Sequence, residues 1–454
     1  MNKKTYMTVT ALILGLLALS WGLPAAGAGV VDASGIASES VVHSDKADAA
    51  AELAVQRRGQ VPSIPSLKTL SIDRLRGQSF SSTLAIEKQL GDDTGSSAYS
   101  QFYGPPYYNT YMASYRSDGL RVYSRVDLPP TEMPENGYPV IIFAHGWVGV
   151  DGAPGYGFNY AANSYYGDIL DAYVKAGFIL LMPGFRGHGT VNDVPAEGLE
   201  YIQVYDNGSY LSPIFYGIDI LNLLGGVASL EEVDWQAWGA GELRVDTSRI
   251  YLTGHSQGGD AAFTALAVSS SPKLTDHFAA ASIWAGSIEG RIEQGAFFGP
   301  QEASSDALTD PAYFPHMPWW WDPAWYWGTI EDGIAFKKAE MYDTVRAYVA
   351  NQSNANPETN SLVNVMATLD ASKYTHYINA PLDLHYSDMD HYSIPEWNET
   401  VIRKIRATGG SGNAYLYAGN THEFDTYAGW SPPGAVPGRE TAIARTIALF
   451  SNTP

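Results

Sequence analysis

The chain has 454 residues and a formal net charge of −21, and it contains no cysteine. Without cysteine it can form no disulfide, and no thiolate is present to bind a metal or to attack a substrate. The acidic balance argues against a nucleic-acid partner and against binding to anionic membranes. A chain of this length can bury a large core, either in one domain with an insertion or in two domains.

The first 28 residues are expected to be a signal peptide. Lys3 and Lys4 precede the apolar run MTVTALILGLLALSWGL, and the small residues after it offer a cleavage site following Ala28. The alternative is a retained membrane anchor, for which this run is short compared with the roughly 20 residues of a transmembrane helix. We therefore expect an exported protein, periplasmic or extracellular, without stable membrane insertion once the signal peptide is removed.

Residues 29–95 are rich in alanine, serine and aspartate. A helix is expected in the run SDKADAAAELAVQRR, and Pro62 and Pro65 interrupt the pattern after it. A segment of this composition is expected to be a pro-segment or a loosely packed N-terminal arm.

From residue 108 onward, apolar strand-like runs alternate with helical patterns. Two strands are expected around the turn Ser117-Asp118-Gly119. The next helical run is expected to bury one face, made by Ile169, Leu170, Tyr173 and Val174. Further strand runs are YPVIIFAHG, FILLMPG, RIYLTGH, FAAASIW, APLDLHYS and NAYLYAG. Buried strands that alternate with helices predict an α/β fold, with a mostly parallel central sheet and helices on both faces.

The run IYLTGHSQGG places Ser256 between Gly254 and Gly258, after a strand and before the helical run DAAFTALAVSS. A serine in such a tight strand-to-helix turn needs small residues two positions away on either side, because larger side chains would collide. The turn would present the Ser256 hydroxyl beside the first N–H groups of a helix, which suits a nucleophile whose product carries an oxyanion. An ordinary glycine-rich turn with a passive serine is the alternative.

A serine hydroxyl is a weak nucleophile unless a base takes its proton. His422 follows the last expected strand and is the favoured base, with His391 as its main rival. The acid that orients the base should follow the preceding strand, where both Asp388 and Asp390 are found.

An oxyanion needs two N–H donors. The backbone of Gln257, directly after the serine, is one candidate, and the backbone of Trp147, in the loop after the run YPVIIFAHG, is the other. Arg186, in the loop GFRGHG, offers a group that binds carboxylates, but an arginine in such a loop is expected to pair internally.

Taken together, the motifs resemble those of the α/β-hydrolase fold. In chain order they are FAHGW, GFRGHG, GHSQGG, DMDHYSIPEW and NTHEF. The chain is most similar to the prolyl oligopeptidase-like and dienelactone hydrolase-like branches, over about residues 108–450. This resemblance implies a triad of Ser256, His422 and Asp390, since counting back from the Glu-Trp pair after the acid motif reaches Asp390. One extra residue in that stretch keeps Asp388 open.

Residues 288–378 interrupt the fold and are expected to form a helical cap, so that the catalytic domain comprises 96–287 and 379–454. Five of the twelve tryptophans fall within residues 319–327. So dense an aromatic group either lines a pocket for an apolar or aromatic acyl group or a sugar, or attaches the cap to the body. The candidate substrate-binding residues are Trp319, Trp320, Trp321, Trp325 and Trp327.

The sequence thus predicts an exported serine hydrolase that cleaves carboxylic esters through an acyl-enzyme. A serine peptidase acting on short peptides is the alternative, and a catalytically silent binding protein is a third possibility that would require a missing triad member. The expected partner is a small ester or a short peptide. Neither a cofactor nor a metal is expected, because the sequence shows no group of residues with metal-ligand spacing.

Overall fold

The computed structural model describes residues 68–90, 109–147, 166–199, 201, 212–286, 288, 367–388, 390, 393, 395–425 and 438–454. They fall within one compact unit, Val61–Pro454. The predicted signal peptide, the predicted helix in the N-terminal arm, His391 and the tryptophan-rich segment 319–327 lie outside the described residues. Among the helices that are described, none combines the length and the apolar character needed to span a bilayer.

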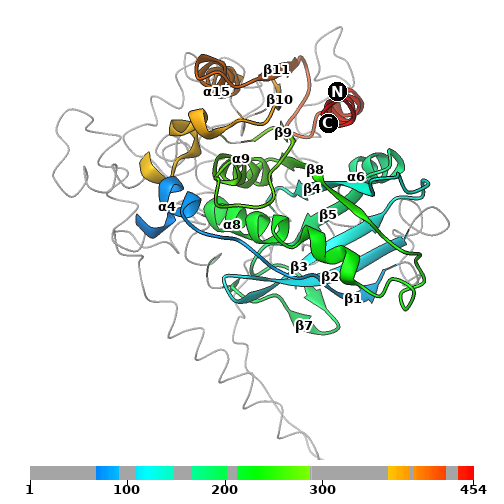
Figure 1. The fold of residues 1–454 in the computed structure, drawn as a ribbon. Helices are drawn as coiled ribbons and strands as arrows, with labels where there is room; N and C mark the ends of the chain where they lie inside the picture. The colour runs from blue at the N-terminus through cyan, green and yellow to red at the C-terminus, as the bar shows by residue number, and fades with distance from the viewer. Residues whose placement is uncertain are drawn as a thin grey trace, which may run out of the picture. The chain divides into compact units, whose positions relative to one another are not determined.

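A nine-stranded sheet lies at the centre of the described residues, with the strand order β1-β2-β3-β5-β4-β8-β9-β10-β11 (Figure 1). The strands are β1 (Ala85–Gln89), β2 (Asn109–Ser117), β3 (Leu120–Leu128), β4 (Tyr138–Ala144), β5 (Ile179–Pro183), β8 (Val245–His255), β9 (Ala280–Trp284), β10 (Leu382–Ser387) and β11 (Gly412–Tyr417). Pairing is parallel from β5 through β4 and β8 to β11, and antiparallel between β1 and β2, β2 and β3, and β3 and β5. The mostly parallel sheet expected from the sequence is confirmed.

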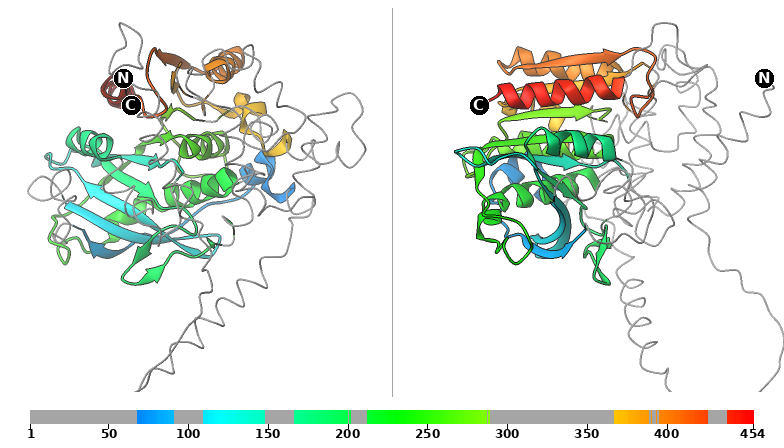
Figure 2. Two further views of the ribbon diagram at one scale, coloured as in Figure 1. Left: turned by 180° about the vertical axis from the view of Figure 1, so that it is seen from behind. Right: turned by 90° about the vertical axis from the view of Figure 1, so that its right-hand side faces the viewer.

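Helices cover both faces of this sheet. Figure 1 shows α8, α9 and α15 on one side and α6 and α16 on the other, and Figure 2 gives the same layers from behind and from the side. The α-helices are α4 (Ile72–Arg76), α6 (Gly167–Lys175), α8 (Ser212–Leu224), α9 (Gln257–Ser269), α15 (Pro395–Ala407) and α16 (Gly438–Asn452). The shorter elements are η1 (Lys68–Leu70), η4 (Val227–Glu232), η5 (Ala371–Lys373), η6 (Thr375–Tyr377) and the small hairpin β6 (Thr190–Val191) and β7 (Val194–Pro195).

The central strands read as continuous apolar runs because both of their faces are buried. In β4, Val140 and Ile142 pack into the apolar layer beneath α8 and α9, whereas Ile141 and Phe143 pack into the layer beneath α6 and α16. Successive side chains of a strand point to opposite faces, so one strand serves both layers. The four residues predicted to form the apolar face of α6 are all buried, as expected.

The predicted turn between the first two strands of the body is confirmed. Ser117 pairs with Leu120, and the two residues between them have positive φ, 51° at Asp118 and 81° at Gly119. Two positive φ angles in a two-residue loop match the twist of a tight antiparallel hairpin.

The boundary predicted for the N-terminal arm is wrong. Residues 72–89 belong to the folded body: Ile72, Leu75, Phe80 and Leu84 are buried in the α8 and α9 layer, and β1 extends the sheet by pairing with β2. Residues 29–95 are rich in serine on average, so the composition did not indicate these widely spaced apolar residues. They are buried because they pack against a sheet edge and a helix face.

Two further features of the C-terminal half differ from the expectations. Leu369, Ala371 and Ile378 are buried in the core, so the last part of the expected cap, from residue 367, packs on the body. Helix α15 was not expected, because its sequence is mostly polar outside a narrow apolar stripe. His385 lies inside β10 and is buried, within the strand run APLDLHYS expected from the sequence.

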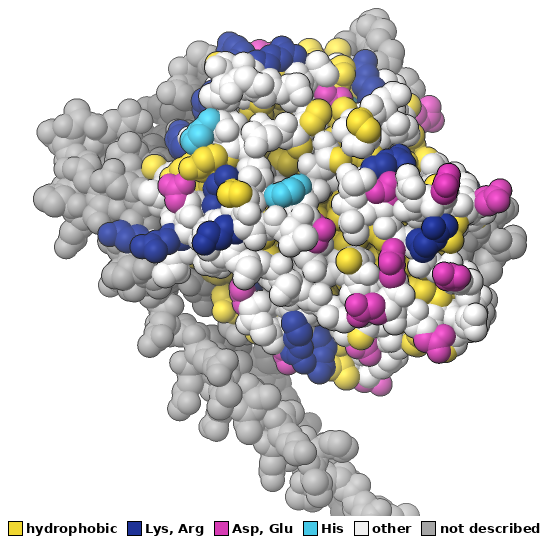
Figure 3. Space-filling model, viewed as in Figure 1, with side chains coloured by type: hydrophobic (Ala, Val, Ile, Leu, Met, Phe, Trp, Pro, Cys, Tyr) yellow, Lys and Arg dark blue, Asp and Glu magenta, His cyan; other side chains and the backbone are white. Residues whose placement is uncertain are grey.

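Charged side chains of both signs share the surface. On the face shown in Figure 3, Lys and Arg side chains of the described residues are scattered among Asp and Glu side chains and do not form one stripe. On this face the described residues therefore form no basic patch of the kind that binds the phosphate backbone of a nucleic acid.

We predict that a shortened chain beginning at Val61 folds, whereas one beginning at residue 91, after β1, is severely destabilised. The second loses four buried apolar side chains, each of which contributes about 1.5–3 kcal/mol when buried. This sum is comparable with the whole stability of a typical domain, about 5–15 kcal/mol. Thermal unfolding followed by circular dichroism measures the difference. Equal midpoints for the two chains would contradict the placement of β1 in the fold.

Candidate active site

The turn that carries Ser256 joins the end of β8 to the start of α9. Ser256 has φ of 56° and ψ of −127°, a backbone conformation that residues other than glycine rarely adopt. Such a conformation costs on the order of 1–3 kcal/mol and persists only where the surrounding structure enforces it. This strained strand-to-helix turn is the geometry of a nucleophile elbow.

Two glycines make this turn possible. A Cβ atom on Gly258 would lie 2.2 Å from the carbonyl oxygen of His145 and 2.3 Å from that of Ala144. A Cβ atom on Gly254 would lie 2.6 Å from the carbonyl oxygen of Gly258. These distances are far below any real carbon–oxygen contact, so the turn excludes every side chain at both positions, in agreement with the steric argument from the sequence.

The structure brings His422 against Asp390. The ring Nδ1 of His422 lies 2.9 Å from Oδ1 and 2.8 Å from Oδ2 of Asp390, whose carboxylate is buried. Burial of the His422 ring opposes its protonation, but the charge and hydrogen bond of Asp390 and the charge of Glu423 outweigh burial and raise the pKa of His422. A carboxylate on Nδ1 leaves Nε2 of a neutral ring as the proton acceptor.

Asp388 has a different partner. Its Oδ1 accepts a hydrogen bond of 2.6 Å from the backbone N–H of Gly419, in the loop that follows β11. The preceding residue, Ser387, donates its hydroxyl to the carbonyl oxygen of Thr421 at 2.8 Å. These two bonds join the loop after β10 to the loop after β11, and so bring the segments of Asp390 and His422 together.

The loop that carries Asp390 is also attached to the next strand of the sheet. The backbone N–H of Ser393 donates to Asp390 Oδ1 at 3.2 Å, and the Ser393 hydroxyl donates to the carbonyl oxygen of Gly286, just beyond β9, at 2.8 Å. Asn398, on α15, donates to the same hydroxyl at 3.0 Å. Helix α15, which the sequence did not predict, thus helps to hold the loop that carries Asp390.

The two candidate oxyanion donors belong to the start of α9 and to the loop after β4. Gln257 is the first residue of α9, and its side chain donates to the hydroxyl of Ser212 at 3.2 Å. In the loop after β4, the N–H of Gly146 donates to the hydroxyl of Tyr166 at 2.8 Å. Because that bond occupies the Gly146 amide, Trp147 remains the candidate donor from this loop.

Arg186 pairs internally, as expected. Its Nη2 lies 2.7 Å from Asp219 Oδ1, and both side chains are fully buried. The hydroxyl of Ser117 donates to the same Asp219 oxygen at 2.6 Å. The pair therefore joins the loop after β5 to α8 and to the hairpin turn, and its charge is neutralised within the fold.

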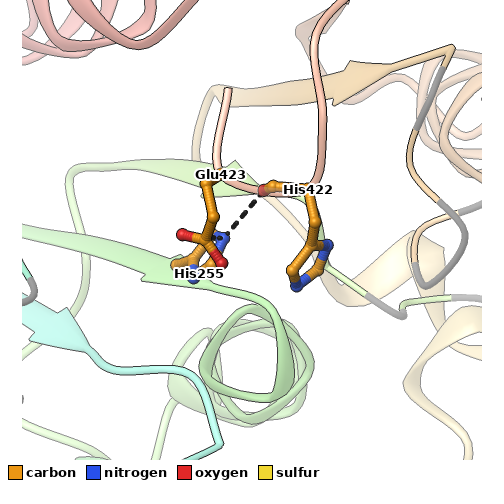
Figure 4. Close-up of side chains that lie close together, drawn as sticks. All are labelled: His255, His422 and Glu423. Carbon is orange, nitrogen blue, oxygen red and sulfur yellow. Dashed lines mark hydrogen bonds and ion pairs between the residues drawn. The ribbon is translucent and has the colours of Figure 1, made fainter. Parts of the chain in front are cut away.

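His255 is a residue whose role the sequence did not reveal. Its side chain reaches two segments that are distant in the sequence. Its Nδ1 lies 2.8 Å from the Tyr166 hydroxyl and its Nε2 lies 3.1 Å from the carbonyl oxygen of His422 (Figure 4). The carboxylate of Glu423 is 3.8 Å from the same Nε2 and 4.0 Å from Nη1 of Arg439. A histidine in a strand-to-helix turn carries no sequence signal of such distant partners.

Three ligand atoms, one each from His255, His422 and Glu423, lie within 4.8 Å of one another. Both ring nitrogens of His255 already have hydrogen-bond partners, and Nδ1 of His422 faces Asp390. The positive charge of Arg439 beside Glu423 further disfavours a cation there. We therefore interpret this group as a hydrogen-bonded cluster.

The strand order and the three polar loops together decide the fold. A strained serine follows β8, a buried acid follows β10 and a histidine bonded to that acid follows β11. The chain has the α/β-hydrolase fold. In this fold the reactive groups lie at the carboxyl ends of the parallel strands, along one edge of the sheet.

Solved structures that this chain matches in a comparison of structures include esterases and peptidases. An acetyl xylan esterase from a Paenibacillus species matches with a TM-score of 0.48 and 16% identity, over 87% of this chain and 98% of its own. Acetyl xylan esterase 1 from a Thermoanaerobacterium species matches with a TM-score of 0.45 and 14% identity, over 88% and 98%. The acylaminoacyl peptidase of Pyrococcus horikoshii matches with a TM-score of 0.45 and 17% identity, over 77% of this chain and 42% of its own.

The present chain therefore spans less than half the length of that peptidase. Comparison of the sequence with protein-family models and with curated proteins gives no match. At these TM-scores and identities, the assignment of the fold depends on the strand order and the elbow of this chain, and not on the similarities.

We predict that the His422 ring titrates above the ordinary histidine pKa of about 6.5. Replacing Asp390 with Asn removes the charge that favours the protonated ring, so the pKa of His422 falls in the Asp390→Asn variant. Titration of the ring followed by NMR measures both values. Asp388→Asn is the matched control, because it removes a neighbouring charge that does not bond to the ring. A larger fall in the control than in Asp390→Asn would contradict the assignment.

Proposed function

We propose that this protein is an exported serine hydrolase that cleaves carboxylic esters, with Ser256 as nucleophile, His422 as base and Asp390 as the acid that orients the base. Two observations carry the proposal: the contact of His422 with both oxygens of Asp390, and the strained elbow at Ser256, which directly follows His255, whose ring centroid is 4.9 Å from that of His422. A buried acid–base pair and a strained nucleophile at the same sheet edge are the parts that acyl transfer requires.

In the proposed reaction, the Ser256 oxygen attacks the ester carbonyl carbon while Nε2 of His422 takes the hydroxyl proton. The negative charge that develops on the carbonyl oxygen is stabilised by the backbone N–H groups of Gln257 and Trp147. Collapse of the tetrahedral intermediate breaks the bond to the alkoxy oxygen, which receives the proton from His422 and leaves as an alcohol. Water then attacks the acyl carbon while Nε2 of His422 takes its proton; the bond from that carbon to the Ser256 oxygen breaks, His422 returns the proton to Ser256, and the carboxylic acid leaves.

The buried carboxylate of Asp390 supports this cycle at the step where His422 becomes positively charged. It fixes the tautomer in which Nε2 faces the nucleophile, and it stabilises the imidazolium. Loss of an equivalent carboxylate lowers turnover by about 10⁴-fold in enzymes of this type.

A peptidase with the same triad is the competing function. Such an enzyme needs a group that binds a charged peptide terminus. Glu423, the residue after the base, is an acidic side chain in this region, but its carboxylate lies between His255 and Arg439. The Glu423 carboxylate thus already lies against two side chains of the fold, which favours ester cleavage over recognition of a peptide amine.

The proposal predicts that a fluorophosphonate probe labels the protein and that Ser256→Ala abolishes this labelling. His422→Ala is expected to slow labelling by about 10⁴-fold or more, since the serine then has no base. In-gel fluorescence against time measures both rates, and Ser269→Ala, at the far end of the same helix, serves as the control. Labelling that survives Ser256→Ala would remove the basis of the proposal.

The choice between ester and peptide predicts a difference in specificity. We expect p-nitrophenyl esters of short acids to be hydrolysed with a kcat/KM at least about 10²-fold above that for aminoacyl or peptidyl p-nitroanilides, after allowance for the leaving group, as measured by release of the chromophore. The opposite order would establish the peptidase. Secretion of the full chain, with N-terminal sequencing of the mature protein, tests export and the cleavage site after Ala28.

A further inference from the structure

We propose that Tyr166 and His255 are positioning residues that hold the oxyanion loop after β4 at a fixed distance from the base His422. They do so through a chain of hydrogen bonds that runs from the N–H of Gly146 to the carbonyl oxygen of His422. The inference rests on the proposed function, because it assigns these two residues a part in the same reaction.

The hydrogen-bond chain consists of three successive bonds. The Gly146 nitrogen lies 2.8 Å from the Tyr166 hydroxyl, that hydroxyl lies 2.8 Å from Nδ1 of His255, and Nε2 of His255 lies 3.1 Å from the His422 carbonyl oxygen. The bond to His422 goes to its main chain, and Figure 4 shows the His422 ring directed away from the carbonyl group that His255 contacts. This bond therefore does not involve the ring of His422, whose Nδ1 lies against Asp390.

The two ends of the chain fix the direction of every bond in it. A backbone N–H can only donate, so the Tyr166 oxygen accepts from Gly146 and its single proton is donated to His255. A carbonyl oxygen can only accept, so Nε2 of His255 carries the proton that is donated to His422. Both conditions are met by one state of His255, the neutral ring protonated on Nε2. Burial of the ring lowers the pKa of His255, which favours this neutral state.

The residues of this hydrogen-bond chain are buried and closely packed. Tyr166 and His255 are 2% and 3% exposed, so water does not compete effectively for these bonds. A Cβ atom on Gly146 would lie 2.8 Å from the Tyr166 hydroxyl and 3.1 Å from the Cβ of Ser256. The oxyanion loop is therefore held between the nucleophile and Tyr166, and the lack of a side chain at Gly146 is what permits the approach.

The consequence for the reaction is geometric. The Gly146 bond fixes the peptide plane next to Trp147, whose N–H is the proposed second oxyanion donor, and the His422 bond fixes the backbone that carries the base. A displacement of about 1 Å in such groups can cost about 10²-fold in rate. A neutral His255 also avoids repulsion with the imidazolium that forms on His422, whose ring centroid is 4.9 Å from that of His255.

Tyr166→Phe tests the chain by removing one hydroxyl with almost no change in volume. We expect kcat for a p-nitrophenyl ester to fall about 10- to 100-fold while KM changes less than about threefold, since the bond positions groups that act in the transition state. The control is Tyr251→Phe, which removes another hydroxyl from the same apolar layer, one that donates to the carbonyl oxygen of Thr453 at 2.6 Å. The Tyr251→Phe variant is expected to have the same kcat as the wild type.

Two replacements of His255 test the two ends separately. His255→Asn retains an acceptor near the position of Nδ1 and loses the donor to His422, and His255→Gln retains a donor near Nε2 and loses the acceptor for Tyr166. Each is expected to recover part of the kcat that His255→Ala loses, whereas a residue that only fills space would be replaced equally well by Leu. Combining Tyr166→Phe with His255→Gln should add little to either loss, because both break the same bond.

The outcomes separate this inference from the proposed function. Wild-type protein that does not react with the fluorophosphonate would reject the proposed function and this inference with it. Reactive wild type with equal kcat in Tyr166→Phe and Tyr251→Phe would reject only the positioning role. A ¹⁵N NMR spectrum that places the proton of neutral His255 on Nδ1 would also reject it, whatever the substrate.

Discussion

The site depends on one close approach between backbones. The first turn of α9 passes so near the end of β4 that a Cβ atom on Gly258 would lie 2.3 Å or less from two carbonyl oxygens. This contact holds Ser256 in a conformation with positive φ and places the helix N-terminus beside the loop that follows β4. Because parallel strands end at the same edge of the sheet, the loops after β10 and β11 reach the same place. The strain at Ser256 persists because the strands on both sides of β8 leave the turn no room to relax.

The loops beyond the sheet are held mainly by hydrogen bonds of side chains to backbone. Asp388 and Ser387 join the loop after β10 to the loop after β11, and Ser393 attaches the acid's loop to the end of β9. Each such bond contributes on the order of 1 kcal/mol net, more where a carboxylate accepts. Together they restrict where Asp390 and His422 can lie, and the two side chains are held in contact. An acid–base pair that needs no rearrangement is the basis of electrostatic preorganisation.

At the edge of the site, arginine side chains pair with carboxylates. Arg186 and Asp219 neutralise each other inside the fold, and Arg439 lies against Asp168 and Glu423. At the centre, hydrogen bonds link the amide of Gly146, the hydroxyl of Tyr166 and the ring of His255 to the backbone of His422. Burial of the His422 ring lowers its pKa, but the charge and hydrogen bond of Asp390 raise the pKa of His422, and the charge of Glu423 adds a smaller effect of the same sign.

The sequence by itself determined the alternation of strands and helices, the elbow at Ser256 and the order of the polar motifs. These features are local, because strand and helix periodicity and the size limit beside a tight turn are properties of neighbouring residues. Tertiary structure decided what depends on distant partners. The choice between Asp388 and Asp390 depended on which of two similar side chains faces a ring 32 residues later in the chain. The burial of residues 72–89 required a sheet edge to receive them, and the bonds of His255 required two loops that no spacing in the sequence brings together.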